Sequence, residues 1–551
     1  MRAGHTFRTN SDTEVLLTGY AHWGAEVLQK LDGMFAFALY DKRTRTLFCA
    51  RDPYGQKPFF YHVANGRLAF SSECRTFELL TGFHSAIDAA SLVDFLAFES
   101  LPFDRSIYSG VKKLPPGHSL SWQDGKLLVA PYFESVPGVD VAAGDGPAHD
   151  ADVHALLRQS VKRTFRADVP VGLLLSGGLD SSMVLAILRE VHPSVPLKTF
   201  TIRNVEHSYD ESALAAMLAK RFGTEHVVVT ADRPALAAIA SSLPSMLDEP
   251  QADPGILPKY MICGEIARTT KVALTGDGGD EFFYGYAPFR AQRLAGMVKL
   301  LPDALHRYGV RPLTQLLRAS NRYMSFDLKA KQFAKGFPAP DYLRNFYWTC
   351  AFSRPDLALL LLERNQHFDD LTRQFGLLKA RWGKVDTLGA NGAGGSIGRL
   401  AYQYQQQYLP DYVLANSDRA SMLNSVELRT PFLAVDLVRK LNSLPDSVKM
   451  RGGETKTLLR RLAARILPQE IAKGRKVGFT APVASLVRNE LKEEVMEFLG
   501  GPYLRRQGLF HEPYVARLLH EHFTGRHNHY KQIWVLFTLQ KWLHGRKIQL
   551  P

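Results

Sequence analysis

The chain has 551 residues, of which 46% are hydrophobic and 22% are charged, and its formal net charge is +14. This length predicts several domains, while the lack of an apolar run of roughly 18 residues and of an apolar leader argues against a membrane span and a secretory signal. We therefore expect a cytoplasmic protein, whose positive charge suits a polyphosphate substrate, a nucleic acid or an anionic surface.

Short strand-like segments dominate residues 11–122. Aromatic and β-branched residues alternate there with Gly, Asp and Asn, for example in GMFAFALYD at 33–41, and this pattern predicts a β-rich unit. A stretch rich in Gly, Pro and Ala, from Val136 to Asp150, then interrupts the pattern and indicates a linker.

Strand and helix patterns alternate after the linker. Strands are predicted at 171–175, 197–202 and 226–230, and helices at 153–165, 181–191 and 211–223. This alternation predicts an α/β unit with a parallel sheet that is covered by helices on both faces. Helical spacing then dominates residues 290–382 and, after a Gly-rich join at 389–398, the rest of the chain to residue 551.

The first strand of the α/β unit ends in a serine- and glycine-rich loop that leads directly into a helix. Backbone NH groups and the positive end of that helix suit an anion, which Gly177 and Gly178 would allow to approach closely. Ser176, Ser181 and Ser182 would add hydroxyl donors. The GxxxxGK pattern of γ-phosphate hydrolysis is absent. A turn that only caps the helix is the alternative interpretation.

A second polar loop, GDGGDE at 276–281, follows the strand pattern KVAL. Because both loops follow parallel strands, Asp277 and Asp280 are expected beside Asp180 at the carboxyl edge of the sheet. Carboxylates beside a phosphate site predict Mg²⁺. A calcium loop is the competing interpretation, but its later ligand positions are missing. The scattered cysteines have no CxxC spacing and disfavour a zinc site.

Four motifs together resemble the glutamine-dependent asparagine synthetases of the B type, in the same order and at similar spacing. They are SGGLDSS at 176–182, TGDGGDE at 275–281, DRASMLNSVELRTPFL at 418–433 and RGGETKTLLRRL at 451–462. Segments before residue 135 resemble the second half of that family's glutaminase domain, and the last helices also match. The likeness therefore covers almost the whole chain.

The resemblance implies a domain organisation. Residues 1–135 would form a truncated, β-rich domain of the N-terminal-nucleophile glutaminase type, a type 2 glutamine amidotransferase, followed by a linker at 136–150. Residues 151–551 would form the asparagine synthetase domain. Within it the resemblance implies a parallel-sheet ATP-pyrophosphatase (PP-loop) core at 151–289, a helical insertion at 290–398 and a helical C-terminal part at 399–551.

The resemblance also implies a ligase reaction that requires ATP and Mg²⁺. The carboxylate of aspartate would attack the α-phosphate of ATP and release pyrophosphate, and ammonia would then displace AMP from the β-aspartyl adenylate to give asparagine. Glutamine or free ammonia would be the nitrogen donor. Negative charge on the departing pyrophosphate would be stabilised by Mg²⁺, by backbone NH groups of the loop and by a lysine.

Specific residues can be assigned by the same resemblance. Asp180 and Asp280 would hold the metal ion, Lys456 would stabilise the pyrophosphate, and Asp277 would handle a proton as ammonia attacks. Leu174 and Ile202 are expected to flank the adenine. The implied ATP- and pyrophosphate-binding residues are Leu174, Ser176, Gly177, Gly178, Leu179, Asp180, Ser181, Ser182, Ile202, Thr275, Gly276 and Lys476. For Lys476, in GRKVGF, a simple surface loop is an equally good interpretation.

The sequence departs from the family pattern at its start. The family's glutaminase uses an N-terminal cysteine, whereas the second residue here is Arg2, and only Asp12 matches a glutamine-binding position. We expect no glutamine hydrolysis by the chain as written, and we favour a missing upstream segment over decay to a scaffold. A second departure is Ala434, where the family usually has Asp; Asp436 offers a nearby carboxylate.

Other functions remain open at this point. A relative could act on another carboxylate, such as a surface sugar acid or a peptide or β-lactam precursor. PP-loops also occur in RNA-modifying proteins, but the chain lacks an RNA-binding module, so a nucleic acid is not expected as partner. A non-catalytic scaffold is the last alternative. The expected partners are ATP, aspartate or another carboxylate, and ammonia or glutamine, with no membrane; a homodimer is an option that the sequence does not decide.

Overall fold

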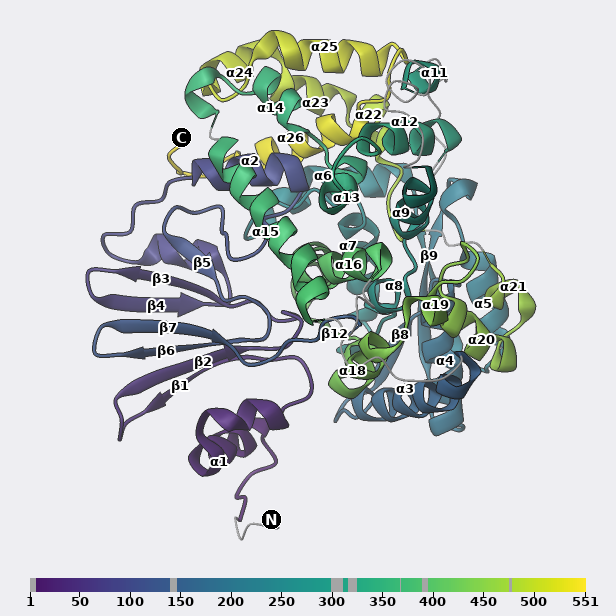
Figure 1. Ribbon diagram of the computed structural model, residues 1–551. Helices are drawn as coiled ribbons and strands as arrows, with labels where there is room; N and C mark the ends of the chain where they lie inside the picture. Colours follow the sequence, from purple (N-terminus) through teal and green to yellow (C-terminus); the bar gives the residue numbers. More distant parts are fainter. Residues whose placement is uncertain are drawn as a thin grey trace.

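The computed structural model describes residues 6–138, 146–298, 311–315, 325–366, 368–388, 395–474 and 478–551. Its N-terminal part contains two antiparallel sheets that stack on each other, at the left of Figure 1. The first has the order β1-β2-β6-β7, with strands Ala36–Asp41, Thr46–Arg51, His118–Gln123 and Lys126–Pro131. The second has the order β4-β3-β5, with strands Arg67–Ser71, Phe60–Ala64 and Val111–Lys113. Buried side chains from both sheets form a common core, and they include Cys49, Phe59, Tyr61, Leu114 and Leu120.

Helices interrupt this β-rich part, so the prediction of strands and turns throughout 11–122 is wrong at these places. They are α1 (Asp12–Trp23), the 3-10 helices η1 (Gly24–Lys30) and η2 (Cys74–Leu79), and α2 (Ala89–Phe98). Ser11 and Asp88 cap α1 and α2, since each side chain accepts a hydrogen bond from a backbone NH of the first turn. Almost every residue of α2 is buried, so its run of apolar residues lacks the polar face by which a sequence pattern reveals a helix.

A five-stranded parallel sheet occupies the other half of the molecule, in the order β10-β9-β8-β11-β12. Its strands are β8 (Val171–Leu174), β9 (Lys198–Asn204), β10 (Glu225–Ala231), β11 (Val272–Leu274) and β12 (Glu427–Arg429). One face packs against α3 (Asp150–Thr164), α4 (Leu179–Val191) and α5 (Ser212–Arg221), and the other against α7 (Ile256–Ile266). The predicted fold class, a β-rich N-terminal part followed by a parallel α/β unit with helical additions, is confirmed.

The remaining elements are helical, and in residues 290–382 the described part of the chain contains no strand. Strand β12 lies in a stretch for which the sequence predicts only helices, and that prediction is wrong. None of the described helices combines the length and the apolar character that a membrane crossing needs. The α-helices not yet given and the π-helix η8 are α6 (Arg233–Met246), α8 (Gly279–Phe283), α9 (Ala287–Val298), α11 (Arg311–Gln315), α12 (Phe326–Gly336), α13 (Asp341–Thr349), α14 (Arg354–Leu360), α15 (Phe368–Leu388), α16 (Ser396–Gln403), η8 (Tyr404–Leu414), α17 (Ala415–Met422), α18 (Val435–Ser443), α19 (Asp446–Lys449), α20 (Thr457–Ile466), α21 (Gln469–Ala472), α22 (Val483–Arg488), α23 (Lys492–Leu499), α24 (Gly501–Gln507), α25 (Glu512–Phe523) and α26 (Tyr530–Leu543). Short 3-10 helices add η3 (Gly146–His149), η4 (His207–Tyr209), η6 (Glu363–Asn365) and η9 (Pro431–Leu433).

The largest hydrophobic core joins the two halves. It combines Phe60 of strand β3 and Phe77 of η2 with helix α2 and with Trp534 and Trp542 of α26. The rings of Tyr108 and Trp542 meet edge to face, with their centroids 6.1 Å apart. The N-terminal sheets therefore share a core with the C-terminal helices, which fixes their position relative to the parallel sheet.

Candidate functional site

The serine- and glycine-rich loop lies between β8 and α4, at the carboxyl edge of the parallel sheet. The Oγ of Ser176 accepts a hydrogen bond from the backbone NH of Gly178 (3.2 Å) and lies 3.0 Å from the Oγ of Ser181. Gly177 has φ +83°, and a Cβ there would lie 2.7 Å from the carbonyl oxygen of Glu211. Because no side chain caps the N-terminus of α4, the NH groups of its first turn are available to an anion.

The second loop, between β11 and α8, packs directly against the first. A Cβ on Gly276 would lie 2.9 Å from the Cβ of Asp180, and one on Gly279 would lie 2.7 Å from the Cγ of the same residue. The Oγ1 of Thr275 accepts a hydrogen bond from the backbone NH of Asp277 (2.9 Å), which holds the loop in a tight turn. The two glycines allow the two polar loops to touch.

Lys456 joins the two loops from a third part of the chain. It is the N-cap residue of α20, and its ammonium nitrogen lies 2.7 Å from Oδ1 of Asp180 and 2.6 Å from Oδ1 of Asp280. The lysine is buried, and the side chains of Asp180 and Asp280 are 19% and 17% exposed. Three residues singled out from separate motifs therefore meet at one point.

The other predicted residues take the following positions. Leu174, the last residue of β8, and Ile202 on the adjacent β9 are partly buried and contact the core between the sheet and α7. Ser182 donates a hydrogen bond to the carbonyl oxygen of Gly178 (2.6 Å) within the loop. Asp12 is exposed at the start of α1, which lies below the N-terminal sheets next to β1 (Figure 1). Lys476 lies outside the described residues.

Asp277 has two partners that the sequence analysis missed. Its Oδ2 accepts a hydrogen bond from the hydroxyl of Ser417 (2.6 Å) and lies 3.4 Å from the ammonium nitrogen of Lys259, which in turn donates to Ser417 (2.6 Å). Ser417 directly precedes the motif that begins at Asp418, so the sequence did point to this part of the chain. Lys259 lies in α7, outside every motif, and only the packing of α7 against α17 reveals it.

A row of tyrosines lines the π-helix η8 near this site. Tyr404 stacks on Tyr286 with ring centroids 4.9 Å apart, and Tyr408 stacks on Tyr412 at 4.7 Å. The hydroxyl of Tyr286 donates to Oε1 of Glu281 (2.6 Å), and burial raises the pKa of that carboxyl to about 7. A π-helix is rare in proteins, but where one occurs it is often at a functional site. Here the π-helix η8 brings tyrosines at a spacing of four residues next to the second loop.

The predicted magnesium ligands can be tested against this geometry. Among the described residues no group of three or more His, Cys, Asp and Glu side chains is arranged to hold a metal ion. Asp180 and Asp280 nevertheless converge on a single cation, the ammonium group of Lys456. Carboxylate oxygens are the donors that Mg²⁺ prefers, and this ion usually takes its other ligands from phosphate and water. The two carboxylates therefore fit part of a magnesium site.

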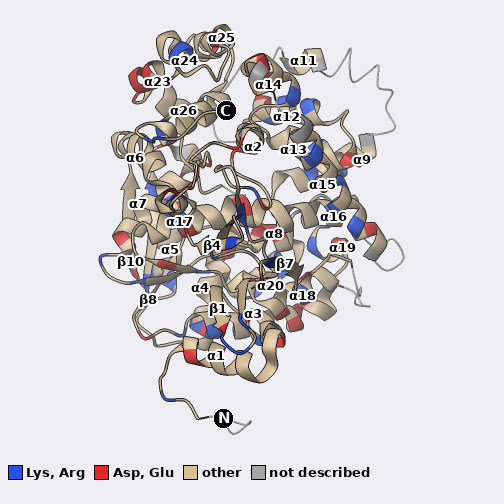
Figure 2. Ribbon diagram, turned by 90° about the vertical axis from the view of Figure 1, so that its left-hand side faces the viewer, with Lys and Arg blue, Asp and Glu red and all other residues tan. Residues whose placement is uncertain are grey.

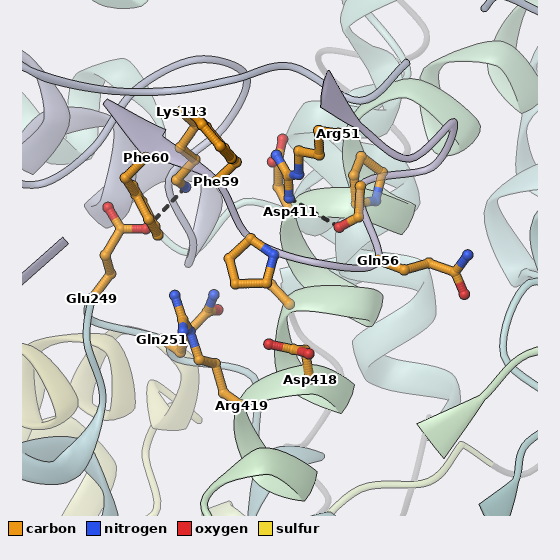
Figure 3. A pocket seen from close by; sticks show the side chains of 14 residues that line it. Arg51, Gln56, Phe59, Phe60, Lys113, Glu249, Gln251, Asp411, Asp418 and Arg419 are labelled. Carbon is orange, nitrogen blue, oxygen red and sulfur yellow. Dashed lines mark hydrogen bonds and ion pairs between the residues drawn. The ribbon is translucent and has the colours of Figure 1, made fainter. Parts of the chain in front are cut away.

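A cavity that is partly open to solvent lies between the N-terminal sheets and the helices η8 and α17 (Figure 3). Charged side chains and apolar residues share its wall, and Lys113 pairs there with Glu249 (3.1 Å). Burial raises the pKa of Asp411 to about 6. Asp418 pairs with Lys57 (2.9 Å) and directly follows Ser417 in α17, so the cavity borders the same helical turn that carries a partner of Asp277. Its labelled lining residues are Arg51, Gln56, Phe59, Phe60, Lys113, Glu249, Gln251, Asp411, Asp418 and Arg419.

Comparison with protein families gives two matches. Residues 152–544 match the asparagine synthase family, and residues 1–133 match the glutamine amidotransferase domain. The chain is 28% identical over 547 residues to the glutamine-hydrolyzing asparagine synthetase 1 of Bacillus subtilis, covering 98% of this chain and 82% of the relative.

Two further relatives widen the comparison. A protein of Mycobacterium bovis with the provisional name of glutamine-hydrolyzing asparagine synthetase is 31% identical, over 98% of this chain and 80% of its own length. The amidase chyE of Penicillium rubens is 29% identical, over 81% of this chain and 68% of its own length. The relatives thus include a protein named for another activity.

Proposed function

Because the chain belongs to the asparagine synthase family and is an ATP-dependent carbon–nitrogen ligase of that type, we propose that it activates the side-chain carboxylate of aspartate with ATP and joins it to ammonia. The observation that carries this proposal is the meeting of Lys456, Asp180 and Asp280 beside the open N-terminus of α4. This arrangement suits the splitting of ATP between its α- and β-phosphates.

In the first step, a carboxylate oxygen of the acceptor attacks the α-phosphorus and the bond to the bridging oxygen of pyrophosphate breaks. Backbone NH groups at the start of α4 hold the phosphates, and the hydroxyls of Ser176 and Ser181 add neutral donors. The Lys456 ammonium neutralises the charge that develops on the leaving pyrophosphate. Asp180 and Asp280 would hold Mg²⁺, which shields phosphate charge when it is bound.

In the second step, the nitrogen of ammonia attacks the acyl carbon and the bond to AMP breaks. The attacking nitrogen must lose a proton, and Asp277 is the carboxylate that we assign to accept it. Its position at the carboxyl edge of the sheet, in the loop between β11 and α8 and three residues before Asp280, supports this assignment. The products are the amide, AMP and pyrophosphate.

The nitrogen source is a further part of the proposal. Residues 1–133 match a glutamine amidotransferase domain, and the cavity at Asp411 and Asp418 lies between that region and the helix that carries Ser417. We propose that ammonia, from glutamine or from solution, reaches Asp277 from this side. The same proposal divides the chain into an amidotransferase-like part at 1–135, a linker at 136–150, an ATP-binding core at 151–289, a helical insertion at 290–398 and a helical C-terminal part at 399–551.

The acceptor is tested by the exchange of labelled pyrophosphate into ATP, measured without ammonia and with a panel of carboxylates. We expect exchange that depends on aspartate and on Mg²⁺. If another acid supports exchange and aspartate does not, that acid is the acceptor instead of aspartate, and the adenylation step of the proposal still stands. Exchange with no acid, in a protein whose circular dichroism spectrum shows that it is folded, would refute the proposal.

A second candidate acts on a different carboxylate, and the likeness to amidase chyE favours it. The carboxylates of surface sugar acids and of peptide and β-lactam precursors therefore belong in the panel. RNA is a weaker candidate, because Figure 2 shows Lys and Arg on many elements and interspersed with Asp and Glu rather than gathered in one stripe. Failure to shift tRNA in a gel at low salt would discard it.

A further inference from the structure

Asp277, Ser417 and Lys259 form a compact polar triad at the point where three elements meet. Asp277 lies in the loop after β11, Lys259 on α7 and Ser417 on α17. The Lys259 and Asp277 side chains are only 12% and 19% exposed, and Ser417 is buried. The ammonium group of Lys259 donates to Ser417, lies 3.4 Å from Asp277 and also interacts electrostatically with the buried Asp253.

The hydroxyl of Ser417 has more than one acceptor within reach. Its Oγ lies 2.6 Å from Oδ2 of Asp277 and 3.0 Å from the carbonyl oxygen of Val413, one turn earlier in the helix, and it accepts from Lys259. A hydroxyl has one hydrogen and two lone pairs. It can therefore donate to an ionised Asp277 or, after turning its hydrogen toward Val413, accept from a protonated one.

The Asp277 carboxyl group therefore has hydrogen-bond partners in both of its protonation states, without any movement of the backbone. In the ionised state, Asp277 accepts from Ser417 and lies beside the Lys259 cation. In the protonated state, the carboxyl O–H donates to Ser417, whose own hydrogen moves to Val413. The Lys259 ammonium, 3.4 Å away, provides the counter-charge to the carboxylate that has to take up the proton.

The triad is anchored from outside. Asn416, next to Ser417, donates to Oδ2 of Asp253 (2.5 Å), and Oδ1 of Asp253 accepts from the backbone NH of Gly255 just before α7 (2.9 Å). Helices α7 and α17 are thus tied together at the level of the triad, which holds Lys259 and Ser417 in register.

We propose that Ser417 and Lys259 are positioning residues for the amide-forming step: together they keep the Asp277 carboxylate ionised until ammonia attacks and then let it hold the proton. This inference rests on the proposed function, because it assumes that Asp277 accepts that proton. It goes beyond the motifs, since neither residue belongs to them and both act through Asp277.

Other titratable groups near Asp277 have to be considered in any pH experiment. Cys263 on α7 and Glu281 on α8 are within electrostatic reach of it. Burial raises the pKa of the Cys263 thiol to about 12, so that this group stays neutral across the working range. Burial raises the pKa of Glu281 to about 7, so a Glu281→Gln variant is included to remove its contribution to the profile.

The test separates the two half-reactions in the full-length protein. Pyrophosphate exchange, without ammonia and with an acceptor that supports it, reports adenylation, and amide formation with ammonium chloride reports the second step. For Ser417→Ala we expect exchange within about twofold of the wild type and amide formation reduced roughly 10- to 100-fold, because the positioned base is lost. Ser417→Thr keeps the hydroxyl and should restore most of the activity. Ser421→Ala, on the same helix and buried, is the matched control and should leave both steps unchanged.

Lys259→Met tests the electrostatic part. Loss of the cation should move the acidic limb of the amide-formation profile to higher pH, while Lys259→Arg should keep it near the wild type. An unchanged second step in Ser417→Ala, or an unshifted limb in Lys259→Met, would overturn the inference and leave the proposed function intact. Loss of both half-reactions in folded Ser417→Ala and Ser417→Thr variants would also overturn it. A wild type that exchanges with no carboxylate would overturn both proposals.

Discussion

Lys456 has a left-handed backbone conformation, with φ 58° and ψ 31°, which residues other than glycine rarely adopt. In this conformation Lys456 places its ammonium group between Asp180 and Asp280, and two ion pairs hold it there. Strained conformations of this kind persist where the surrounding contacts determine them, and they cluster at functional sites. The conformation is thus consistent with a role for Lys456 beyond packing.

Replacement of this lysine is the sharpest test at a single residue. For Lys456→Met we predict a loss of pyrophosphate exchange of roughly 100-fold or more, because one positioned donor to developing charge is typically worth this much. The control is Lys440→Met, which removes a surface lysine paired with Asp152 and should leave exchange unchanged. Near-wild-type exchange by the Lys456→Met protein would contradict the role given to this residue.

The buried side chain of His522 leads to a prediction about how the free energy of unfolding depends on pH. It is fully buried on α25, neither ring nitrogen has a hydrogen-bond partner within the described part of the chain, and burial lowers the pKa of the ring to about 3. An unfolded histidine has a pKa of roughly 6.5, so the unfolded chain binds more protons between these two values. The free energy of unfolding should therefore fall as the pH drops below about 6.5, by up to about 1.4 kcal/mol per pH unit from this one group.

The change can be measured by urea unfolding at pH 7.5 and 5.5. In His522→Leu, the difference in free energy of unfolding between the two pH values should shrink by roughly 1 kcal/mol relative to the wild type. His520→Gln, which changes an exposed histidine of the same helix, should keep the wild-type difference. An equal pH dependence in His522→Leu and wild type would show that this ring is not held neutral.

At the scale of the elements, the turn after α8 determines where the ammonium group of Lys456 lies. A Cβ on Gly285 would lie 1.9 Å from Oδ1 of Asp280 and 2.2 Å from Cε of Lys456. Neither partner can retreat without breaking the ion pair between them, so we predict that Gly285→Ala lowers pyrophosphate exchange at least 10-fold, by the loss of the positioned Lys456 donor.

The matched control is Gly376→Ala. Gly376 lies within α15, where a Cβ would meet nothing within 4 Å, and the change should leave exchange intact and stabilise the helix by up to about 1 kcal/mol. Full activity of Gly285→Ala would mean that Lys456 need not occupy the observed position.

The same scale shows what the sequence could predict. The strands β8 to β11 and their polar loops were recognisable because apolar runs end in Ser, Gly and Asp, and so Asp180, Asp277 and Asp280 could be named. Strand β12 was missed because its three residues, Glu427 to Arg429, are too few for a period to appear, and its pairing with β11 is set by the fold. Lys259 and Ser417 could not be paired from the sequence, since they are 158 residues apart and meet only through helix packing.

For the whole molecule, the shared core predicts cooperative unfolding. Helix α2 and the N-terminal sheets contribute to the core that also contains Trp534 and Trp542, and the ion pairs Lys57–Asp418 and Lys113–Glu249 connect the same two halves. Because separation of the halves would expose this core to water, we expect one transition in urea, with the same midpoint by far-ultraviolet circular dichroism and tryptophan fluorescence. Two transitions with different midpoints would contradict a common core.

The most direct test of the whole account identifies the products of ATP. The purified protein is incubated with ATP, Mg²⁺, ammonium chloride and the acceptor that supports exchange, and the phosphorus species are followed by ³¹P NMR. If the two polar loops and Lys456 split ATP between the α- and β-phosphates, AMP and pyrophosphate form in equal amounts, with one of each per amide. If ADP and inorganic phosphate accompany amide formation instead, the central claim is wrong.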